Sequence, residues 1–297
     1  MPDAGPSFAH RSSGRPSITA ESVCFARAVE HLRPEGERIV DDPYAQHFLG
    51  RAAKAALRAT ALNGPATRLF RRLDPGAMAY VPARHRYIDD ALLATLAAGA
   101  EQVVLLGAGY DSRAYRFADE LAGRPVYEVD LAPISRRKAD TIARHRADFP
   151  ATDVHRVEID FETQTIPETL AAAGFTAGRP TFVVWEGVSM YLTRAAVKAT
   201  LRAVWEATGP GSALAMDVWY LVDDPSPMGT AQRVAPGALS AIGEAVTFGI
   251  HHEEMPDFMG RLGWSVVDVA TTDDLATRYG GGRGIMGSMY LLTATRD

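Results

Sequence analysis

The chain has 297 residues, of which 47% are hydrophobic and 23% charged, and its formal net charge is −5 at pH 7. This composition is that of an ordinary globular protein with room for one large domain or two small ones. The negative charge argues against a general nucleic-acid-binding protein, because phosphate backbones are held by clustered Lys and Arg. Cys24 is the only cysteine, which excludes an internal disulfide and a cysteine metal cluster and fits a reducing cytoplasm.

The N-terminal segment contains the first predicted boundary. Residues 1–16 carry Pro, Ser and Gly and no apolar core of a secretory signal, so we expect a flexible tail. The longest apolar stretch, Ala91–Ala100, is too short to span a bilayer. These features predict a soluble cytoplasmic protein that binds neither membrane nor nucleic acid, and no metal site is expected.

The first hundred residues are predicted to be mainly helical, with no strand signal. Apolar residues at helical spacing predict a helix from Thr19 that ends before Pro34. A second helix is expected to begin at Pro43, capped by the Asp residues before it. Further helices are expected over Ala52–Ala61 and Arg84–Ala97.

From Gln102 onward the pattern changes to short, continuous apolar runs that alternate with helical segments. The runs, typical of strands buried on both faces, are Val103–Leu106, Val126–Val129, Val154–Ile159, Thr181–Trp185 and Ala213–Val218. The helical segments are Ser112–Leu121, Pro133–Arg146, Pro167–Ala173 and Thr193–Ala207, with a short amphipathic one around Glu253–Leu262. Two final strands, Trp264–Val269 and Ser288–Thr295, are expected at one sheet edge with a Gly-rich stretch between them. This alternation predicts βαβ units and a mostly parallel sheet.

The densest functional signal is VVLLGAGYDSR. Gly107 and Gly109 follow a buried strand and precede a helix, where glycine permits a sharp turn and the close approach of a ligand. A dinucleotide fingerprint has a third glycine where this chain has Ser112. Asp111 would also repel a pyrophosphate. Both features favour a ligand without phosphates.

Acidic residues end three of the predicted strands. Asp130 lies about twenty residues beyond the glycines, where a carboxylate accepts hydrogen bonds from both hydroxyls of an adenosine ribose. Asp160 and Glu186 place two more carboxylates at the same edge, where an adenine amino group or a sulfonium is compatible with negative charge. Structural alternatives remain: a plain tight turn for the glycines, helix capping for Asp130 and Asp160, and a buried ion pair for Glu186.

Six motifs in order carry a family resemblance: RIVDDPYAQHFL, ARHRYIDDAL, VVLLGAGYDSRAYRF, VYEVDLAP, VEIDF and VVWEGVSMYL. Together they resemble the leucine carboxyl methyltransferase family, and its bacterial branch of tetracenomycin-type polyketide O-methyltransferases looks most similar. The resemblance covers roughly Glu21 to Leu192, with weaker similarity through HHEEMPDFMGRLGW. Ser112 replaces the family's usual Thr and keeps the hydroxyl.

The resemblance implies an α/β, Rossmann-like class I methyltransferase fold. Its sheet is mostly parallel and seven-stranded, with an antiparallel last strand, helices on both faces and an N-terminal helical lid. We expect residues 17–297 to form a single domain, with the lid over 17–98, the core over 99–220, and a substrate-side insertion with the C-terminal strands over 221–297.

The resemblance also implies S-adenosyl-L-methionine as the cofactor and S-adenosyl-L-homocysteine as its product. Carried over by motif, Arg84 binds the methionine carboxylate and Glu186 lies near the amino group. The remaining implied cofactor-binding residues are Gly107, Ala108 and Gly109 against the cofactor, Asp130 and Leu131 at the ribose, and Asp160 and Phe161 at the adenine. Arg27 lies near a basic cofactor contact of the family, with an ion pair to Glu30 as the alternative.

The predicted reaction is methyl transfer to an oxygen of a small molecule such as a polyketide or peptide. A carboxylate is already ionised at neutral pH and needs no general base, whereas a phenol needs one. Tyr191, His251 and His252 are candidates for positioning the acceptor; packing for the tyrosine and surface or capping roles for the histidines are the alternatives. A non-catalytic cofactor-binding protein and an NAD-dependent oxidoreductase are the rival functions, and Ser112 with the lack of a Tyr-x-x-x-Lys motif argues against the second.

Overall fold

The computed structural model describes residues 18–61, 76–160, 163–219, 246–285, 287 and 289–297. The expected N-terminal tail, Phe161 and most of the predicted insertion after residue 220 lie outside these ranges. Within them, no helix combines the length and apolar character needed to cross a bilayer.

One seven-stranded sheet runs through the molecule in the order β3-β2-β1-β4-β5-β7-β6. The strands are β1 (Gln102–Leu106), β2 (Val126–Asp130), β3 (Val154–Glu158), β4 (Thr181–Trp185), β5 (Ser212–Trp219), β6 (Ser265–Ala270) and β7 (Met289–Arg296). The first five pair in parallel, and β7 lies antiparallel between β5 and β6. The predicted Rossmann-like class I methyltransferase fold, with its antiparallel last strand, is therefore confirmed.

The central strands are apolar without alternation because both faces of the sheet are covered. Val103 and Leu105 of β1 belong to one hydrophobic cluster, which includes Leu92. Val104 and Leu106 belong to the other, which includes Leu201. Such two-sided burial is the reason why parallel strands appear in a sequence as continuous hydrophobic runs.

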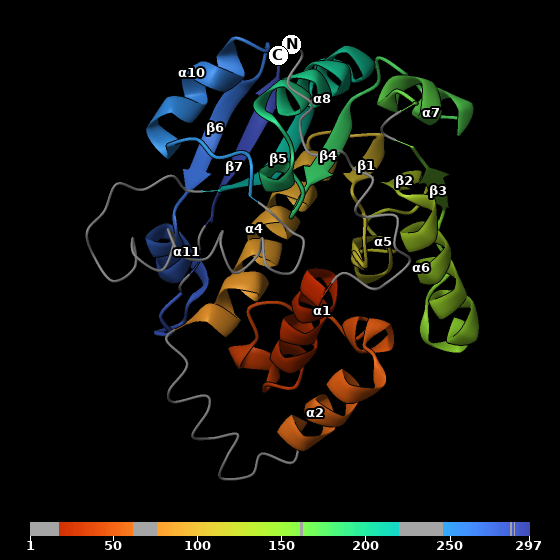
Figure 1. The fold of residues 1–297 in the computed structure, drawn as a ribbon, viewed down its shortest axis with the longest axis vertical. Helices are drawn as coiled ribbons and strands as arrows, with labels where there is room; N and C mark the ends of the chain where they lie inside the picture. The colour runs from red at the N-terminus through yellow and green to blue at the C-terminus, as the bar shows by residue number, and fades with distance from the viewer. Residues whose placement is uncertain (1–17, 62–75, 161–162, 220–245, 286, 288) are drawn as a thin grey trace, which may run out of the picture.

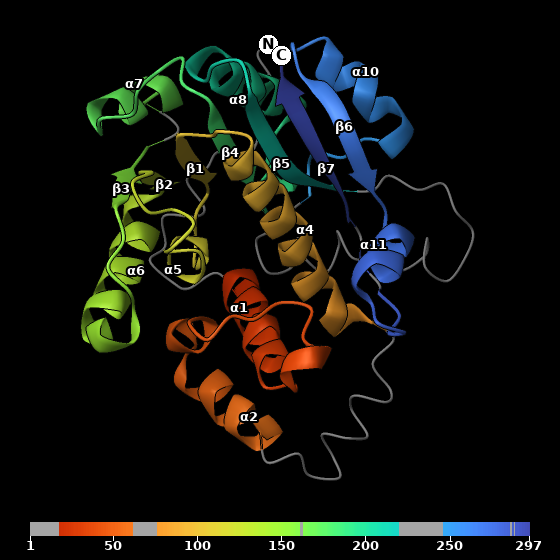
Figure 2. The ribbon, with the colours of Figure 1, turned by 180° about the vertical axis from the view of Figure 1, so that it is seen from behind.

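The helices form one layer on each face of the sheet, and a further group lies beyond the carboxyl ends of its parallel strands. Figures 1 and 2 show α7 (Ile166–Ala172), α8 (Arg194–Ala207) and α10 (Met255–Gly260) on one face, with α4 (Ala77–Ala97) and α11 (Thr272–Tyr279) on the other. α6 (Ala132–Arg144) contacts β2 and β3, and α5 (Arg113–Arg116) follows β1. α1 (Ile18–His31) and α2 (Arg51–Ala61) lie beyond the carboxyl ends of the parallel strands (Figure 1). Short 3-10 turns complete the set: η2 (Glu35–Glu37), η3 (Ala45–Phe48), η4 (Arg146–Asp148), η5 (Ser189–Tyr191) and η6 (His252–Glu254).

Several predicted boundaries differ from the observed ones. The helix expected at Pro43 is only the 3-10 turn η3, and its N-cap is Tyr44, without a side-chain capping bond. Asp42 accepts hydrogen bonds from the Tyr44 and Ala45 N–H groups at the start of this turn. α5 is shorter than the predicted Ser112–Leu121, because the backbone leaves helical geometry at Phe117. α4 begins seven residues before the predicted start, with Pro82 inside it.

One helix was missed altogether. α11 occupies part of the segment in which only a Gly-rich stretch was expected between the last two strands. Its start is fixed by a capping box, in which the side chains of Thr271 and Asp274 each accept a hydrogen bond from the other's backbone N–H. The T-x-x-D spacing was a local signal for this helix.

Candidate active site

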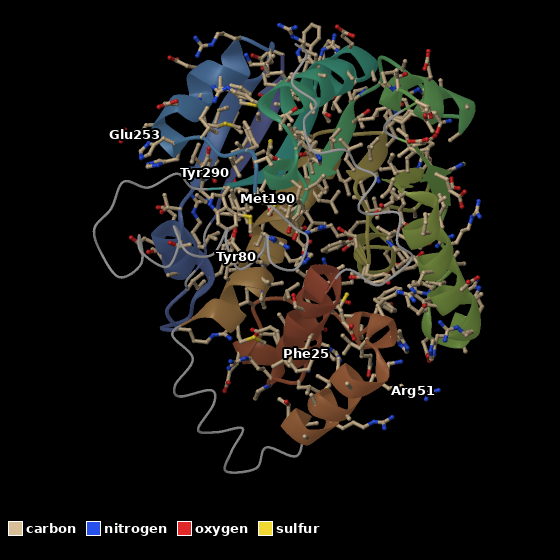
Figure 3. The ribbon with its side chains drawn as sticks, in the orientation of Figure 1. Phe25, Arg51, Tyr80, Met190, Glu253 and Tyr290 are labelled. Carbon is tan, nitrogen blue, oxygen red and sulfur yellow. The ribbon has the colours of Figure 1, made fainter. Side chains whose placement is uncertain are left out.

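A cavity of about 570 Å³ opens at the carboxyl ends of β1, β2 and β4. Figure 3 labels one lining residue, Met190, at the centre of the molecule between the sheet and the N-terminal helices. The sequence-predicted residues that line this cavity are Arg27, Arg84, Gly107, Ala108, Gly109, Asp130, Leu131, Glu186 and Tyr191. The structure therefore brings together, in one place, residues that lie on five separate segments of the chain.

The turn after β1 requires glycine at its first position. Gly107 has φ +66°, a left-handed conformation, and a Cβ there would lie 2.4 Å from Cγ2 of Val188. The N–H groups of Gly107 and Ala108 both donate to the carbonyl of Val129, at 2.8 and 3.1 Å. The turn is thus fastened to the end of β2 and presents main chain to the cavity.

Asp130 ends β2 on the opposite side of this turn. Its Oδ2 accepts a hydrogen bond from the Gly109 N–H at 2.6 Å, and its Oδ1 accepts one from the Leu131 N–H at 2.7 Å. The N-cap of α6 is Leu131, so helix capping does not explain the carboxylate. Two backbone donors instead fix the orientation of this carboxylate at the cavity.

Arg84 and Glu186 meet at the end of β4. Arg84 Nε lies 2.7 Å from Glu186 Oε1, and its Nη1 donates to Asp217 Oδ2 at 2.9 Å. Burial opposes the charge of Arg84, but the two carboxylates outweigh it and raise its pKa. For Asp217, burial disfavours the charged carboxylate and raises its pKa, although the positive charge of Arg84 acts in the opposite direction. Glu186 therefore forms the buried ion pair that was its structural alternative, and it does so among the residues that line the cavity.

Arg113, which the sequence reasoning assigned no role, is the hub of this charge cluster. Its guanidinium donates to Asp89 Oδ1 at 2.8 Å, to Glu186 Oε2 at 2.9 Å and to Asp111. A further nitrogen lies 2.8 Å from His85 Nδ1. Burial lowers the pKa of His85, and the surrounding arginines lower it further, so this imidazole is neutral at physiological pH.

The cluster extends to the N-terminal helix through Ser112. Arg27 of α1 donates to Asp42 Oδ2 at 2.8 Å and to the Tyr110 carbonyl at 2.9 Å. Ser112 Oγ donates to the same Asp42 oxygen and accepts from Arg27. Glu30, the alternative partner of Arg27, pairs instead with Arg33 and Arg283. Arg27 therefore joins α1 to the turn that borders the cavity.

Other predicted residues lie elsewhere. Asp160 is exposed, accepts a hydrogen bond from Thr163 Oγ1 at 3.0 Å and does not line the cavity; Gln164 and Thr165 of the same loop do. His251 caps η6 by accepting from the Glu253 N–H, and neither it nor His252 lines the cavity. Tyr191 is the positioning candidate that does.

The carboxylates that line the cavity indicate what kind of ligand it suits. Asp111, Asp130 and Glu186 all line it, and Glu186 Oε1 is buried without an aligned hydrogen bond although two nitrogen atoms lie within ion-pair distance. Such a buried acceptor favours a ligand that brings hydrogen-bond donors or positive charge.

Comparison with known proteins identifies the relatives of this chain. The family model for leucine carboxyl methyltransferase matches residues 20–205. A protein of Mycobacteroides abscessus described as an S-adenosyl-L-methionine-dependent methyltransferase is 32% identical, over 93% of this chain and 91% of its own. A protein of Streptomyces coelicolor with the same description is 32% identical, over 83% and 80%.

Solved structures give the same fold. A DUF574-family protein from Streptomyces avermitilis superimposes with a TM-score of 0.57 at 19% identity, covering 92% of this chain and 97% of its own. A protein from Thermobifida fusca described as a methyltransferase gives a TM-score of 0.56 at 16% identity, covering 96% and 97%. At these identities the likeness concerns the fold alone.

Proposed function

Because the chain belongs to the leucine carboxyl methyltransferase family and is an S-adenosylmethionine-dependent methyltransferase, we propose that it methylates an oxygen atom of a small molecule. The favoured acceptor is a carboxylate, in preference to a hydroxyl, on a compound of the polyketide or peptide class. The observation that carries the preference for a carboxylate is the state of His85, the one histidine among the described residues that line the cavity.

His85 is unsuited to act as a general base. It is buried, its pKa is held well below the usual value, and Nδ1 faces the Arg113 guanidinium, which leaves Nε2 toward Glu186. A phenol, with a pKa near 10, requires a base to remove its proton. A carboxylate is ionised at neutral pH, so positioning alone suffices.

The donors and acceptors around the cavity support the cofactor roles that the family resemblance implies. When bound, S-adenosylmethionine supplies a methyl group on a sulfonium, which an acceptor oxygen displaces in line. Asp130 holds the ribose hydroxyls, with its carboxylate already aligned by two backbone N–H groups. Glu186 receives the ammonium of the methionine part at its buried Oε1. Gly107, Ala108 and Gly109 let the ligand lie against main chain.

Arg84 takes the methionine carboxylate in this scheme. Its Nε and Nη1 face Glu186 and Asp217, and a guanidinium carries further N–H donors for a third carboxylate. Leu131 borders the nucleoside, and Gln164 and Thr165 are better placed than Asp160 to meet the adenine because they line the cavity. The two carboxylates around Arg84 also lower the local positive charge, which suits a sulfonium.

The acceptor lies against the apolar part of the cavity. Ala196, Ala199 and Ala203 of α8 contribute small side chains, and Met190 and Trp219 contribute large apolar ones. This composition favours an acceptor with an apolar body and few charges beyond the reacting group. Tyr191 is the cavity residue that we assign to orienting the acceptor oxygen. We further propose that residues 17–98 form the lid and that residues 221–297 complete the acceptor side.

Matched sets of acceptors test the proposal. Each set contains one carboxylic acid with the alcohol, phenol and amine of the same apolar body, and methyl transfer is followed with methyl-labelled S-adenosylmethionine. We expect label in a base-labile methyl ester from the acids. Label that appears in ethers or N-methyl products, with none in esters, contradicts the proposed carboxylate preference while leaving the family assignment intact.

A further inference from the structure

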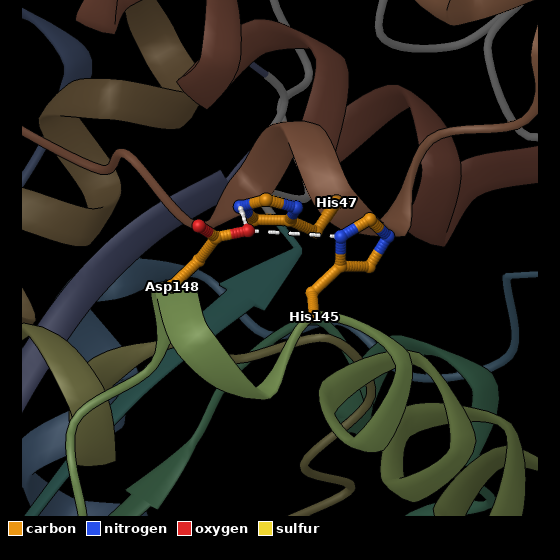
Figure 4. Close-up of side chains that lie close together, drawn as sticks. All are labelled: His47, His145 and Asp148. Carbon is orange, nitrogen blue, oxygen red and sulfur yellow. Dashed lines mark ion pairs between the residues drawn. The ribbon is translucent and has the colours of Figure 1, made fainter.

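A cluster of three side chains that bind metals elsewhere in proteins lies outside the methyl-transfer cavity. His47 belongs to η3, His145 is the C-cap residue of α6, and Asp148 ends η4. Figure 4 shows that one oxygen of the Asp148 carboxylate faces a ring nitrogen of His47 and a ring nitrogen of His145. Asp148 Oδ2 lies 3.7 Å from His47 Nε2 and 3.7 Å from His145 Nδ1. One ligand atom from each residue lies within 4.8 Å of the other two.

We propose that His47, His145 and Asp148 bind a divalent transition-metal ion of the zinc type, which ties the N-terminal segment to the core. Two imidazole nitrogens and one carboxylate oxygen are a ligand set that Zn²⁺ and Co²⁺ accept. Ca²⁺ and Mg²⁺ favour oxygen ligands alone, so the two imidazoles select against them. With three protein ligands, a solvent molecule takes the fourth position.

The distances match such an ion after a small adjustment. Ligand bonds of about 2.0–2.2 Å in a tetrahedral site place neighbouring ligand atoms about 3.4 Å apart. The two observed 3.7 Å separations therefore need to shorten by only a few tenths of an ångström. The two imidazole nitrogens lie within 4.8 Å of each other and need to approach by about 1.4 Å at most. The side chain of Asp148 is 55% exposed and that of His145 33%, so an ion and its solvent ligand can reach the cluster from outside.

The surrounding structure holds the ligands near one another. The His47 and His145 rings lie 4.5 Å apart, centre to centre, and His47 also contacts the ring of Phe149 at 5.3 Å. Tyr44 stacks on Phe149 at 4.9 Å. These contacts bring η3 against the α6–η4 corner before any ion binds, which reduces the entropy lost on coordination. The positive charge of nearby Lys54 opposes the binding of a cation at the cluster, so we expect a moderate metal affinity.

The three ligands come from the two parts of the chain that the ion would join. η3 follows Asp42, which accepts a hydrogen bond from Ala45, the first residue of this turn, and pairs with Arg27 of α1. α6 and η4 follow β2 of the sheet. None of the three side chains lines the methyl-transfer cavity. The ion therefore has a structural role that is separate from the chemistry, and its binding is measurable without any assay of methyl transfer.

The test uses untagged full-length protein that has been dialysed against a chelator. Co²⁺ is titrated while its visible absorption is followed, Zn²⁺ is then added as competitor, and thermal unfolding is recorded with and without Zn²⁺. We expect one equivalent to bind with a tetrahedral cobalt spectrum, and Zn²⁺ to displace it and raise the melting temperature. H145A and D148N are each expected to weaken binding by about tenfold or more, because loss of a ligand costs at least as much as loss of an outer-shell partner, which costs roughly 10–100-fold.

The matched control is the double variant H251A/H252A, which removes the one pair of adjacent histidines in the sequence. Their rings lie 4.6 Å apart, much like those of the cluster, and they are expected to contribute nothing to the site. S-adenosylmethionine affinity serves as the check that each variant is folded. The test variants are placed at His145 and Asp148 because these side chains are more exposed than His47, so their loss is less damaging to folding. Absence of saturable binding, retention of full affinity in H145A, or loss of binding in the control overturns the proposal.

Discussion

Arg84 of α4 and Glu186 at the end of β4 form a buried ion pair, with Nε of the first 2.7 Å from Oε1 of the second. The family resemblance assigns these two residues to the carboxylate and the amino group, which share one carbon of the methionine part of the cofactor. In the structure they contact each other, and Asp217 and Arg113 continue the pair on either side. The cluster holds both side chains in place at the cavity, so a ligand meets an already ordered set of charges.

The contribution of this cluster to stability is testable with Glu186→Gln. The change leaves Arg84 and Arg113 buried with one carboxylate fewer, and removing one partner of a buried pair costs about 3–5 kcal/mol. Glu101→Gln, which breaks the exposed pair with Arg179, is the control and should cost less than about 1 kcal/mol. Urea unfolding measures both values. Equal losses in the free energy of unfolding in the two variants would show that the buried cluster contributes no more to stability than an exposed ion pair.

Asp130→Asn addresses the proposed ribose contact. The amide keeps the shape but removes the charge and one acceptor oxygen, and hydrogen bonds to charged groups contribute about 1.5–3 kcal/mol, or roughly tenfold or more in affinity. Calorimetry with S-adenosylmethionine should show this weakening. Glu158→Gln, at the end of the neighbouring β3 and paired with exposed Arg136, should bind like the unaltered protein. Unchanged affinity of the Asp130 variant places the ribose elsewhere.

Gly107→Ala tests the crowding of the turn after β1. The positive φ alone costs about 1–2 kcal/mol, and the contact with Val188 adds a further cost of about 1–3 kcal/mol. Gly123→Ala isolates the first effect, because Gly123 has φ +75° and a Cβ at this position would meet no neighbour within 4 Å. Thermal and urea unfolding should therefore show that the Gly107 variant is less stable than the Gly123 variant. The reverse order contradicts the tight approach of Val188.

Asp111 predicts a dependence of stability on pH. Burial raises its pKa, but the Arg113 guanidinium outweighs this effect and lowers the pKa from 3.8 to about 2. A depressed carboxyl pKa stabilises the folded state above the unfolded value, and this stabilisation is lost as the pH falls from about 4 towards 2. Asp111→Asn should therefore be less stable than the unaltered protein at about pH 5, and the gap should narrow at about pH 3.

Urea midpoints at the two pH values measure this gap. Asp153→Asn is the control, because Asp153 is a largely exposed aspartate. The urea midpoint of Asp153→Asn should differ little from that of the unaltered protein, and this small difference should change little with pH. A gap for Asp111→Asn that stays constant across the same range means that its carboxylate is not held by Arg113.

Local patterns predicted most of the sheet and part of the site. β4 was predicted at its observed bounds, because a continuous apolar run between turns is a strong signal for a strand buried on both faces. Gly107 and Asp130 were found from their spacing along a βαβ unit, which is fixed by the geometry of that unit. Both features are encoded within about thirty consecutive residues.

The charge cluster was not predictable in this way. Arg84 contacts Asp217 across 133 residues and Arg113 contacts Glu186 across 73, and no local pattern specifies such partners. Arg113 and Asp89 both lie inside motifs that carry the family resemblance, but buried pairs are recognised only once the fold brings them together. The same holds for His47 and Asp148, which lie on segments that meet through tertiary packing alone.

A crystal structure of the protein with S-adenosyl-L-homocysteine is the most direct test of where the cofactor binds. It should show the ribose hydroxyls on the Asp130 carboxylate, the main chain of Gly107 against the ligand, and the amino group at Glu186. A ligand bound outside the cavity at the carboxyl ends of β1, β2 and β4, or one that leaves Asp130 without contact, contradicts the proposed site.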